Sequence, residues 1–252
     1  MSELNLIFHN IVETTVIAAA VGAFLLGWRH RNRLENNYLL VLGSALLCVG
    51  IAELAQTIAG YIPAEHGGFD RNRHIQLALA GRYIEVLSLL AAPFLMRVRL
   101  GFRRVVFLYA GITFSLIWVI MRTGLFPNCY VESSGLTNFV MDSEYLLSQL
   151  LAVSLGLLIW RYDRFRKRVL AALGVGILIL MFSEVSFAHY LDRSLAPYVL
   201  GHIFLAGSCV VFWGAFMLAV RTAEETERDV CRPPRSESLG GDSADCSPFP
   251  NV

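Results

Sequence analysis

The segment Leu6–Trp28 reads LIFHNIVETTVIAAAVGAFLLGW and is followed directly by the basic run RHRNR at residues 29–33. An apolar run of this length covers the ~20 residues that a transmembrane helix needs. No basic region precedes it, as one would in a cleavable signal peptide, and the arginines after it are typical of a helix that stops in the membrane. The sequence therefore predicts a membrane-spanning helix near the N-terminus.

Six further apolar runs follow this one. Irregular chain is not tolerated in hydrocarbon, so each run that crosses must be a helix. The runs are continuous rather than alternating, which argues against a β-barrel. We therefore predict an all-α polytopic membrane protein built as a seven-transmembrane-helix bundle, with spans at Leu6–Trp28, Tyr38–Ile58, Ile75–Met96, Val105–Met121, Glu144–Trp160, Val169–Ala188 and Pro197–Val220.

The composition agrees with a lipid environment. The 252 residues are 56% hydrophobic and 16% charged, with a mean hydropathy of +0.55. Soluble domains are nearer ~45–50% apolar and ~25% charged. A formal net charge of +1 gives no basic field for nucleic acid. We expect the lipid bilayer as a partner and no nucleic acid.

The distribution of basic residues predicts the orientation. Most of the 21 lysines and arginines lie in the segments that follow the first, third, fifth and seventh runs. Cytoplasmic loops carry such an excess. We therefore expect the N-terminus outside and the C-terminus in the cytoplasm. Residues 1–221 are predicted to form the membrane domain, and residues 222–252 a short cytoplasmic tail that starts helical and ends disordered, since Pro233 and Pro234 stop the helix.

Polar side chains inside the predicted spans are the candidate site. A charged group in a span costs perhaps ~2.5–3.5 kcal/mol even on insertion scales, so such residues usually serve a function. By their positions along the helices, all of them fall in the outer half of the membrane. The candidate ligand-binding residues are His9, Glu13, Glu53, Gln56, Arg82, Glu85, Glu144, Glu184 and His202.

We interpret these residues as the lining of an outward-facing polar cavity. Arg82 is the one side chain among them that is always cationic, and a carboxylate that fails to pair with it can be protonated. The alternative is an interhelical hydrogen-bond network that fixes the bundle and binds nothing. The segment Leu125–Phe139 is expected to fold over this end as a lid, anchored by Tyr130 and Phe139.

Metal and redox chemistry have weak support. His9 and His202 could serve as axial haem ligands, and His9 with Glu13 as one edge of a metal site, but we favour hydrogen bonding for both histidines. No metal site, cofactor or catalytic motif is assigned. We expect no specific role for His30, His66, His74 and His189. Cys129 either pairs with another chain or is a free thiol.

Several short motifs resemble one known family. They are His9-Asn-Ile-Val-Glu13 with Trp28, Asn37-Tyr-Leu-Leu-Val-Leu-Gly43, Gln76 with Ala80-Gly-Arg-Tyr-Ile-Glu-Val-Leu-Ser-Leu-Leu-Ala-Ala-Pro93, Phe126-Pro-Asn-Cys-Tyr-Val-Glu132, Gly135-Leu-Thr137, Ser143-Glu-Tyr145, Ser183-Glu184 with Phe187, and Gly201-His202. In this order they resemble the bacterial membrane-associated sensor domains, in the third of their numbered types. The pattern departs from the family at Glu53 and Gln56, where Asp and His are usual, and at Leu205, where Lys is common.

The resemblance implies a seven-helix sensor of the bacterial inner membrane, of the kind usually fused to a histidine kinase or a diguanylate cyclase. No such domain follows in this chain. We therefore expect a standalone, non-enzymatic sensory domain that detects a periplasmic or membrane-soluble signal and relays it to a separate signalling protein in a two-component or similar system. A homodimer, a haem- or metal-binding membrane enzyme, a small-solute transporter and a truncated sensor remain as alternatives.

Overall fold

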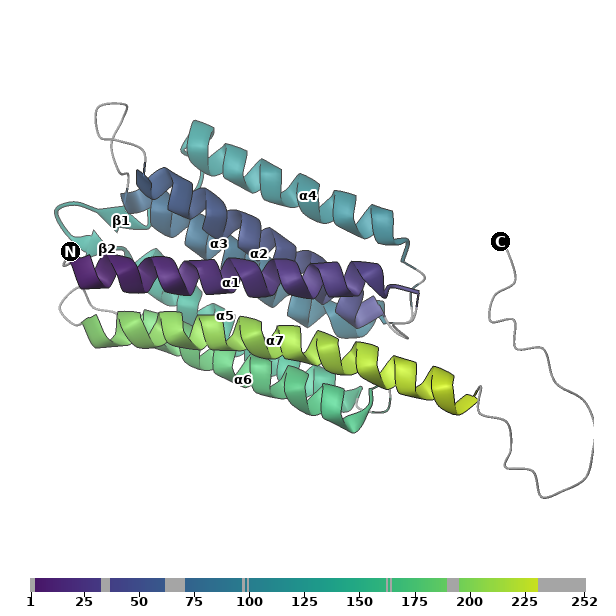
Figure 1. The fold of residues 1–252 in the computed structure, drawn as a ribbon. Helices are drawn as coiled ribbons and strands as arrows, with labels where there is room; N and C mark the ends of the chain where they lie inside the picture. Colours follow the sequence, from purple (N-terminus) through teal and green to yellow (C-terminus); the bar gives the residue numbers. More distant parts are fainter. Residues whose placement is uncertain are drawn as a thin grey trace, which may run out of the picture.

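The protein was analysed as a computed structural model, which describes residues 3–32, 37–61, 71–96, 98, 100–161, 163, 165–189 and 195–230. Seven long helices in this part of the chain are each apolar and long enough to cross a membrane, which confirms the predicted all-α, seven-span membrane fold. They are α1 Glu3–Arg29, α2 Asn37–Tyr61, α3 Arg71–Leu95, α4 Phe102–Trp118, α5 Asn138–Trp160, α6 Lys167–Ala188 and α7 Leu195–Val230 (Figure 1).

Three helices extend by four residues or more beyond the apolar runs that predicted them. Helix α3 begins at Arg71 rather than Ile75, and α5 begins at Asn138 rather than Glu144. The first turn of α3, Arg71-Asn-Arg-His, is polar, and α5 opens with Asn138 and carries Asp142 and Ser143 before Glu144, so the hydropathy of these segments is lower than that of the runs that follow. Helix α7 continues past Val220 to Val230. The remaining tail, residues 231–252, lies outside the described residues.

The fourth helix ends in an irregular turn. After Trp118 the chain widens into a π-helical turn, η2, at Val119–Thr123. Gly124 then adopts a left-handed conformation with φ 63°, which glycine takes without a steric penalty. The short hairpin of β1 (Tyr130–Val131) and β2 (Gly135–Leu136) follows before α5.

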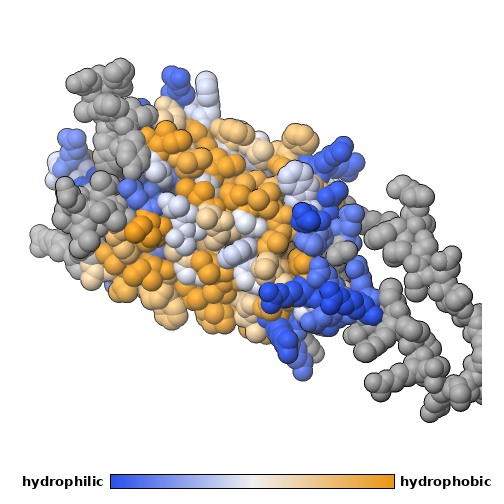
Figure 2. Space-filling model, in the orientation of Figure 1, coloured by the Kyte–Doolittle hydropathy of each residue, from blue (hydrophilic) through white to orange (hydrophobic). Residues whose placement is uncertain are grey.

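The bundle has two distinct ends. The hairpin end carries β1, β2 and the first turns of α1, α3, α5 and α7 (Figure 1). The basic end, opposite, carries exposed cations that include Arg29, Arg31, Arg103, Arg166 and Arg168. Figure 2 shows an apolar belt between hydrophilic side chains at both ends, as expected for a chain that crosses a bilayer.

Helix α4 lies at the edge of the bundle, where it packs chiefly against α2. Only Val105 and Thr113 of this helix are buried, whereas Phe107, Phe114 and Trp118 are more than half exposed. Large apolar side chains on such a face are stable when lipid covers them.

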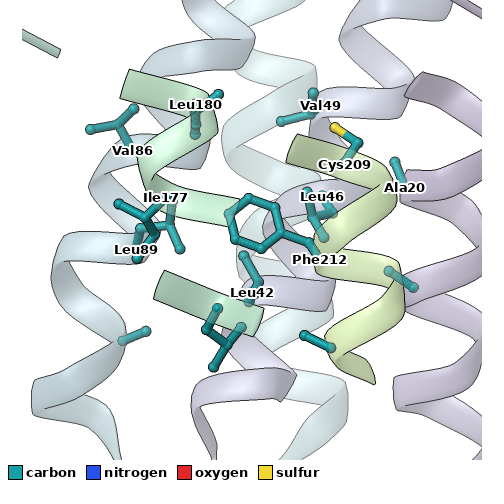
Figure 3. Packing of buried hydrophobic residues seen from close by; sticks show 14 of the residues in the cluster. Ala20, Leu42, Leu46, Val49, Val86, Leu89, Ile177, Leu180, Cys209 and Phe212 are labelled. Carbon is teal, nitrogen blue, oxygen red and sulfur yellow. The ribbon is translucent and has the colours of Figure 1, made fainter. Parts of the chain in front are cut away.

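Phe212 on α7 is the centre of the apolar core (Figure 3). Its fully buried ring packs among Leu42 and Leu46 of α2 and Ile177 of α6. A Cβ atom at Gly176 would lie 2.5 Å from the Phe212 ring, so this position on α6 requires glycine. The close approach of α6 to α7 therefore depends on a residue without a side chain.

Candidate functional site

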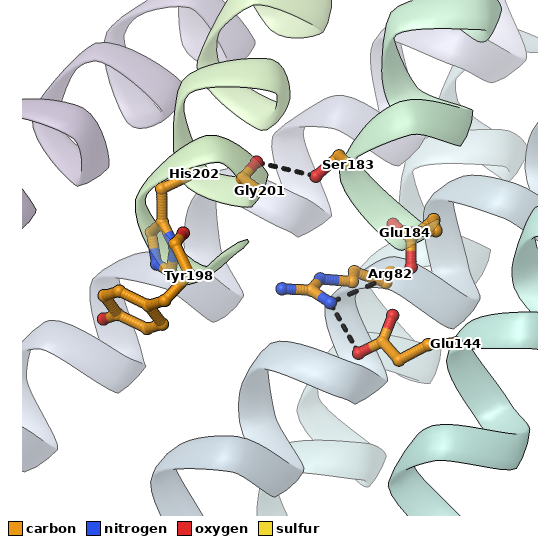
Figure 4. Close-up of polar contacts among 7 residues, drawn as sticks. All are labelled: Arg82, Glu144, Ser183, Glu184, Tyr198, Gly201 and His202. Carbon is orange, nitrogen blue, oxygen red and sulfur yellow. Dashed lines mark hydrogen bonds and ion pairs between the residues drawn. The ribbon is translucent and has the colours of Figure 1, made fainter. Parts of the chain in front are cut away.

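Arg82 on α3 joins three helices through two buried glutamates. Its Nη1 atom donates a hydrogen bond of 2.6 Å to Oε1 of Glu144 on α5, and it lies 3.8 Å from Oε2 of Glu184 on α6 (Figure 4). The three side chains are 9%, 5% and 0% exposed. At this burial, a charge-assisted hydrogen bond is a strong constraint on the positions of the helices.

A chain of aromatic rings links Arg82 to α7. The guanidinium carbon lies 3.8 Å from the centre of the Phe187 ring on α6, within the range of a cation–π interaction. The Phe187 ring lies 5.0 Å from the His202 ring on α7, which in turn lies 4.3 Å from the Tyr198 ring. The route runs from the buried cation to the helix that extends furthest beyond the bundle (Figure 1).

Gly201 provides the space for Phe187. A Cβ atom at this position would lie 2.7 Å from the Phe187 ring. In addition, the Ser183 hydroxyl donates a 2.8 Å hydrogen bond to the Gly201 carbonyl (Figure 4). Helices α6 and α7 are therefore fixed to one another next to Arg82.

Two more carboxyl groups complete the arrangement around Arg82. Glu53 on α2 and Glu85 on α3 both interact electrostatically with Arg82. Glu85 is 0% exposed, and neither of its carboxyl oxygens has a hydrogen-bond partner among the described residues. We call Glu53, Arg82, Glu85, Glu144 and Glu184 the arginine cluster. It holds one cation and four carboxyl groups, all buried.

A second polar group, the amide cluster, consists of Glu13, Gln56, Thr57 and His74. The Gln56 amide nitrogen lies 3.2 Å from Oε1 of Glu13 and 3.0 Å from Nε2 of His74, and the Thr57 hydroxyl donates a 2.8 Å hydrogen bond to Oε2 of Glu13. An amide NH2 group can donate to both acceptors at once. His74, for which we expected no specific role, joins this cluster because α3 is already helical at this position and its ring reaches Gln56 on α2.

The loop before α5 is held against the N-terminal half of α3. The Asn72 side-chain oxygen accepts hydrogen bonds from the backbone nitrogens of Cys129 and Tyr130, at 2.7 and 3.0 Å. Gln76 donates to the carbonyl oxygens of Phe126 and Pro127. The chain that carries Glu144 toward Arg82 is therefore itself positioned by α3.

The predicted lid anchors both make contacts in this loop. Arg71 donates a 2.8 Å hydrogen bond to the Tyr130 hydroxyl, and the Phe139 ring packs edge-on against Phe126 at 6.3 Å. Cys129 is a free, fully buried thiol, which disfavours an interchain disulfide. Burial, with a smaller contribution from the charge of Glu144, raises the pKa of the Cys129 thiol from 9.0 to about 12.

The structure divides the predicted site residues into two groups. Arg82, Glu53, Glu85, Glu144 and Glu184 come together, with His202 reached through Phe187, whereas Glu13 and Gln56 belong to the amide cluster. The side chain of His9 lies outside the described residues. Sequence reasoning did not identify Thr57, His74 and Tyr198 as site residues. Phe187 had one signal, since it lies one helical turn after Glu184.

Within the described residues, no group of three or more His, Cys, Asp or Glu side chains is arranged to hold a metal ion. His202 places its Nδ1 atom 3.0 Å from the Tyr198 carbonyl oxygen and packs its ring against two aromatic side chains. These contacts match the hydrogen-bonding role that we favoured for it. No observation in the described part of the chain favours a haem site.

Comparison with known proteins gives one match. A family model described as a membrane-associated sensor domain, of the third numbered type, matches residues 2–222. No curated protein matches the chain, and neither does any solved structure. The matched family is a sensor domain rather than a catalytic one. It is the same family that the sequence motifs resemble.

Proposed function

Because the chain belongs to the family of membrane-associated sensor domains, we propose that it detects a signal at the arginine cluster and relays it along α7 to a signalling output. We place the protein in the bacterial inner membrane with the hairpin end outside and the basic end in the cytoplasm. The excess of arginine at the basic end supports this orientation. A signal would reach the cluster from the periplasm or from the outer leaflet.

The observation that carries the proposal is the position of Arg82. One guanidinium contacts α5 through Glu144, and α6 through both Glu184 and the Phe187 ring. Any ligand that changes the charge around Arg82 must therefore change the contacts of several helices together. A bundle whose helices share one buried cation is suited to two alternative packings rather than to gradual deformation.

Helix α7 is the element that would transmit the change. It receives the Phe187 ring beside Gly201 at the hairpin end and runs without a break to Val230 beyond the basic end. We propose residues 1–221 as the sensory domain, with the helical turns after Val220 as its output segment. The ligand can shift α7 only if it binds one bundle state more tightly than the other.

The output partner is proposed from the family relationship alone. A histidine kinase or a diguanylate cyclase is the class of protein that such sensors serve, and the cytoplasmic end of α7 is where we expect it to act. No catalytic function is proposed for the chain itself.

Affinity purification from native membranes in mild detergent, followed by native mass spectrometry, tests the proposal. We expect the chain to copurify with a kinase or a cyclase, and the copurified fraction to change in Arg82→Gln. The matched control is Arg122→Gln, an exposed arginine in η2 whose loss should leave the complex unchanged. A folded Arg82→Gln protein that binds the same partner to the same extent, with the same output, would contradict the proposal.

A further inference from the structure

We propose that the ligand of the arginine cluster is the proton, bound at Glu184 and Glu85. This inference rests on the proposed sensory function, because it names the signal that the same site detects: acidity on the hairpin side of the membrane. In the chemical step, a hydronium ion gives its proton to a carboxylate oxygen, an O–H bond forms, and a water molecule is released.

The charges of the cluster are unbalanced. If Glu85, Glu144 and Glu184 were all ionised, three carboxylates would surround one guanidinium at buried positions on α3, α5 and α6. An isolated carboxylate in a medium of low dielectric is so unfavourable that such groups take up a proton instead. Protons on Glu85 and Glu184 would leave Arg82 with the single carboxylate of Glu144 among these three groups.

Glu184 lacks the donor that an ionised carboxylate needs. Arg82 directs its short hydrogen bond to Oε1 of Glu144, and the closest approach of Glu184 to Arg82 is 3.8 Å. Neither oxygen of Glu184, nor Oε2 of Glu144, has a hydrogen-bond donor among the described residues. The Glu184 carboxyl group also interacts with that of Glu144. Two neighbouring carboxylates repel each other when both are ionised, and a proton on one of them removes this repulsion.

Glu85 has no donor for either oxygen within the described residues and is 0% exposed. Titratable and charged groups from four helices interact with it: Glu53 from α2, Arg82 on its own helix, Glu184 from α6 and Cys209 from α7. Arg82, the one permanent cation among them, directs its short bond to Glu144. A proton on Glu85 removes the remaining negative charge at this position.

A proton fits the packing better than a larger cation does. Glu85 and Glu184 are completely buried, so an ion of any size could reach them only if the helices separated. No metal-holding group of side chains occurs in the described part of the chain. A proton adds almost no volume and is transferred along transient water or between neighbouring carboxyl groups.

Loss of the proton would alter the contacts of α7. An ionised Glu184 would compete with Glu144 for the Arg82 guanidinium. The guanidinium carbon lies 3.8 Å from the centre of the Phe187 ring, and Nη1 lies 3.8 Å from Oε2 of Glu184. Movement of the guanidinium toward Glu184 weakens its interaction with Phe187. Because Phe187 contacts Gly201 and His202, α7 is then free to adopt a second packing.

Infrared difference spectroscopy of the full chain in lipid nanodiscs tests the proton site directly. Between about pH 5 and pH 9, where ordinary carboxyls are ionised, a buried protonated carboxyl gives a C=O band that disappears as pH rises. We expect this band in the wild-type protein. Glu85→Gln and Glu184→Gln should each remove about half of it, since the proposal assigns one proton to each residue.

The matched control is Glu132→Gln, which changes an exposed glutamate in the hairpin turn and should leave the band intact. Absence of a titrating band in the wild-type protein, or a band of undiminished intensity in both cluster variants, would overturn the proton assignment. Folding of each variant is checked by size-exclusion chromatography.

A second readout separates this inference from the proposed function. Spin labels at Glu225→Cys on α7 and Arg103→Cys on α4, both exposed, report movement of α7 by electron spin resonance. We expect the label distance to change with pH in the otherwise wild-type protein and to stay constant in Glu184→Gln. A titrating infrared band with a label distance that never changes would support the proton site and contradict the relay along α7.

Discussion

Arg82 is the residue on which the arrangement of the cluster depends. Its two ion contacts and its ring contact connect α3 with α5 and α6. Removal of one partner of a buried ion pair leaves an uncompensated charge and costs about 3–5 kcal/mol. The importance of Arg82 therefore extends from local charge balance to the packing of the bundle.

We predict that Arg82→Gln lowers the free energy of unfolding by about 3 kcal/mol at neutral pH. Its thermal midpoint in detergent should fall clearly below that of the wild-type protein. Arg122→Gln serves as control, because Arg122 is exposed and its one described ring contact, with Trp118, is 5.8 Å long. Equal midpoints for the two variants would mean that the buried ion pairs contribute little.

We predict that Cys129 is unreactive toward maleimide in the folded protein. With a pKa of about 12, its thiolate fraction at pH 8 is about 10⁻⁴, and the side chain is fully buried. Cys231 and Cys246 are replaced by serine so that they do not contribute to the labelling. Ser133→Cys in the hairpin is the exposed control, which should react rapidly. Rapid labelling of Cys129 would contradict the burial of this loop.

The raised pKa of Cys129 also gives a pH dependence of stability. Above pH 9 the unfolded chain releases this proton while the folded protein keeps it. The folded state then binds more protons than the unfolded state, so stability decreases as pH rises from 9 toward 12. At neutral pH the thiol is protonated in both the folded and the unfolded state, so it adds no pH dependence to the stability.

At the scale of single helices, glycines determine how closely α6 and α7 approach. A Cβ atom at Gly201 would lie 2.7 Å from the Phe187 ring, whereas a Cβ atom at Gly214 on the same helix would have no neighbour within 4 Å. The two positions therefore form a matched pair in which only one substitution alters packing.

We predict that Gly201→Ala destabilises the protein by about 1–3 kcal/mol, because the added methyl group must displace the Phe187 ring. Gly214→Ala should be neutral or slightly stabilising, since alanine favours a helix by roughly 1 kcal/mol over glycine. Thermal unfolding of both variants in the same detergent measures the difference. A Gly201→Ala protein as stable as Gly214→Ala would show that α6 and α7 can separate without cost.

The sequence predicted a helix accurately where the whole helix is apolar. The predicted spans Tyr38–Ile58 and Val169–Ala188 agree closely with α2 and α6. It missed the starts of α3 and α5, since α3 opens with the polar turn Arg71-Asn-Arg-His and the first turns of α5 interrupt their apolar residues with Asn138, Asp142 and Ser143. These turns also carry the contacts that hold the loop before α5, which explains why the loop packing was only partly expected.

The candidate residues were predictable, but their pairing was not. A charged side chain in a span is visible in the sequence, and this identified Arg82 and each glutamate of the cluster. Which glutamate pairs with Arg82 depends on the rotation of α5 and α6 about their axes and on which helices are neighbours. The pattern of hydrophobic residues does not determine the rotation of the helices or which helices are neighbours. For the same reason it could not predict that Glu13 and Gln56 belong to a second cluster.

At the scale of the whole molecule, the two ends differ in charge and in structure. The basic end carries exposed arginines, and the hairpin lies at the opposite end of the bundle (Figure 1). We predict that Ser133→Cys is labelled by a membrane-impermeant maleimide on intact cells, whereas Lys167→Cys is labelled only after lysis. The reverse pattern would place the sensing end in the cytoplasm.

The central claim is that the buried arginine cluster controls signalling by the whole protein. The most direct test compares the host's signalling output, as genome-wide transcript levels, in strains carrying the wild-type chain, Arg82→Gln, Arg122→Gln or a deletion of its gene, with the variants at matched membrane levels. We predict that Arg82→Gln reproduces part or all of the deletion's changes and that Arg122→Gln resembles the wild type. A folded Arg82→Gln protein whose output equals that of the wild type would contradict the claim.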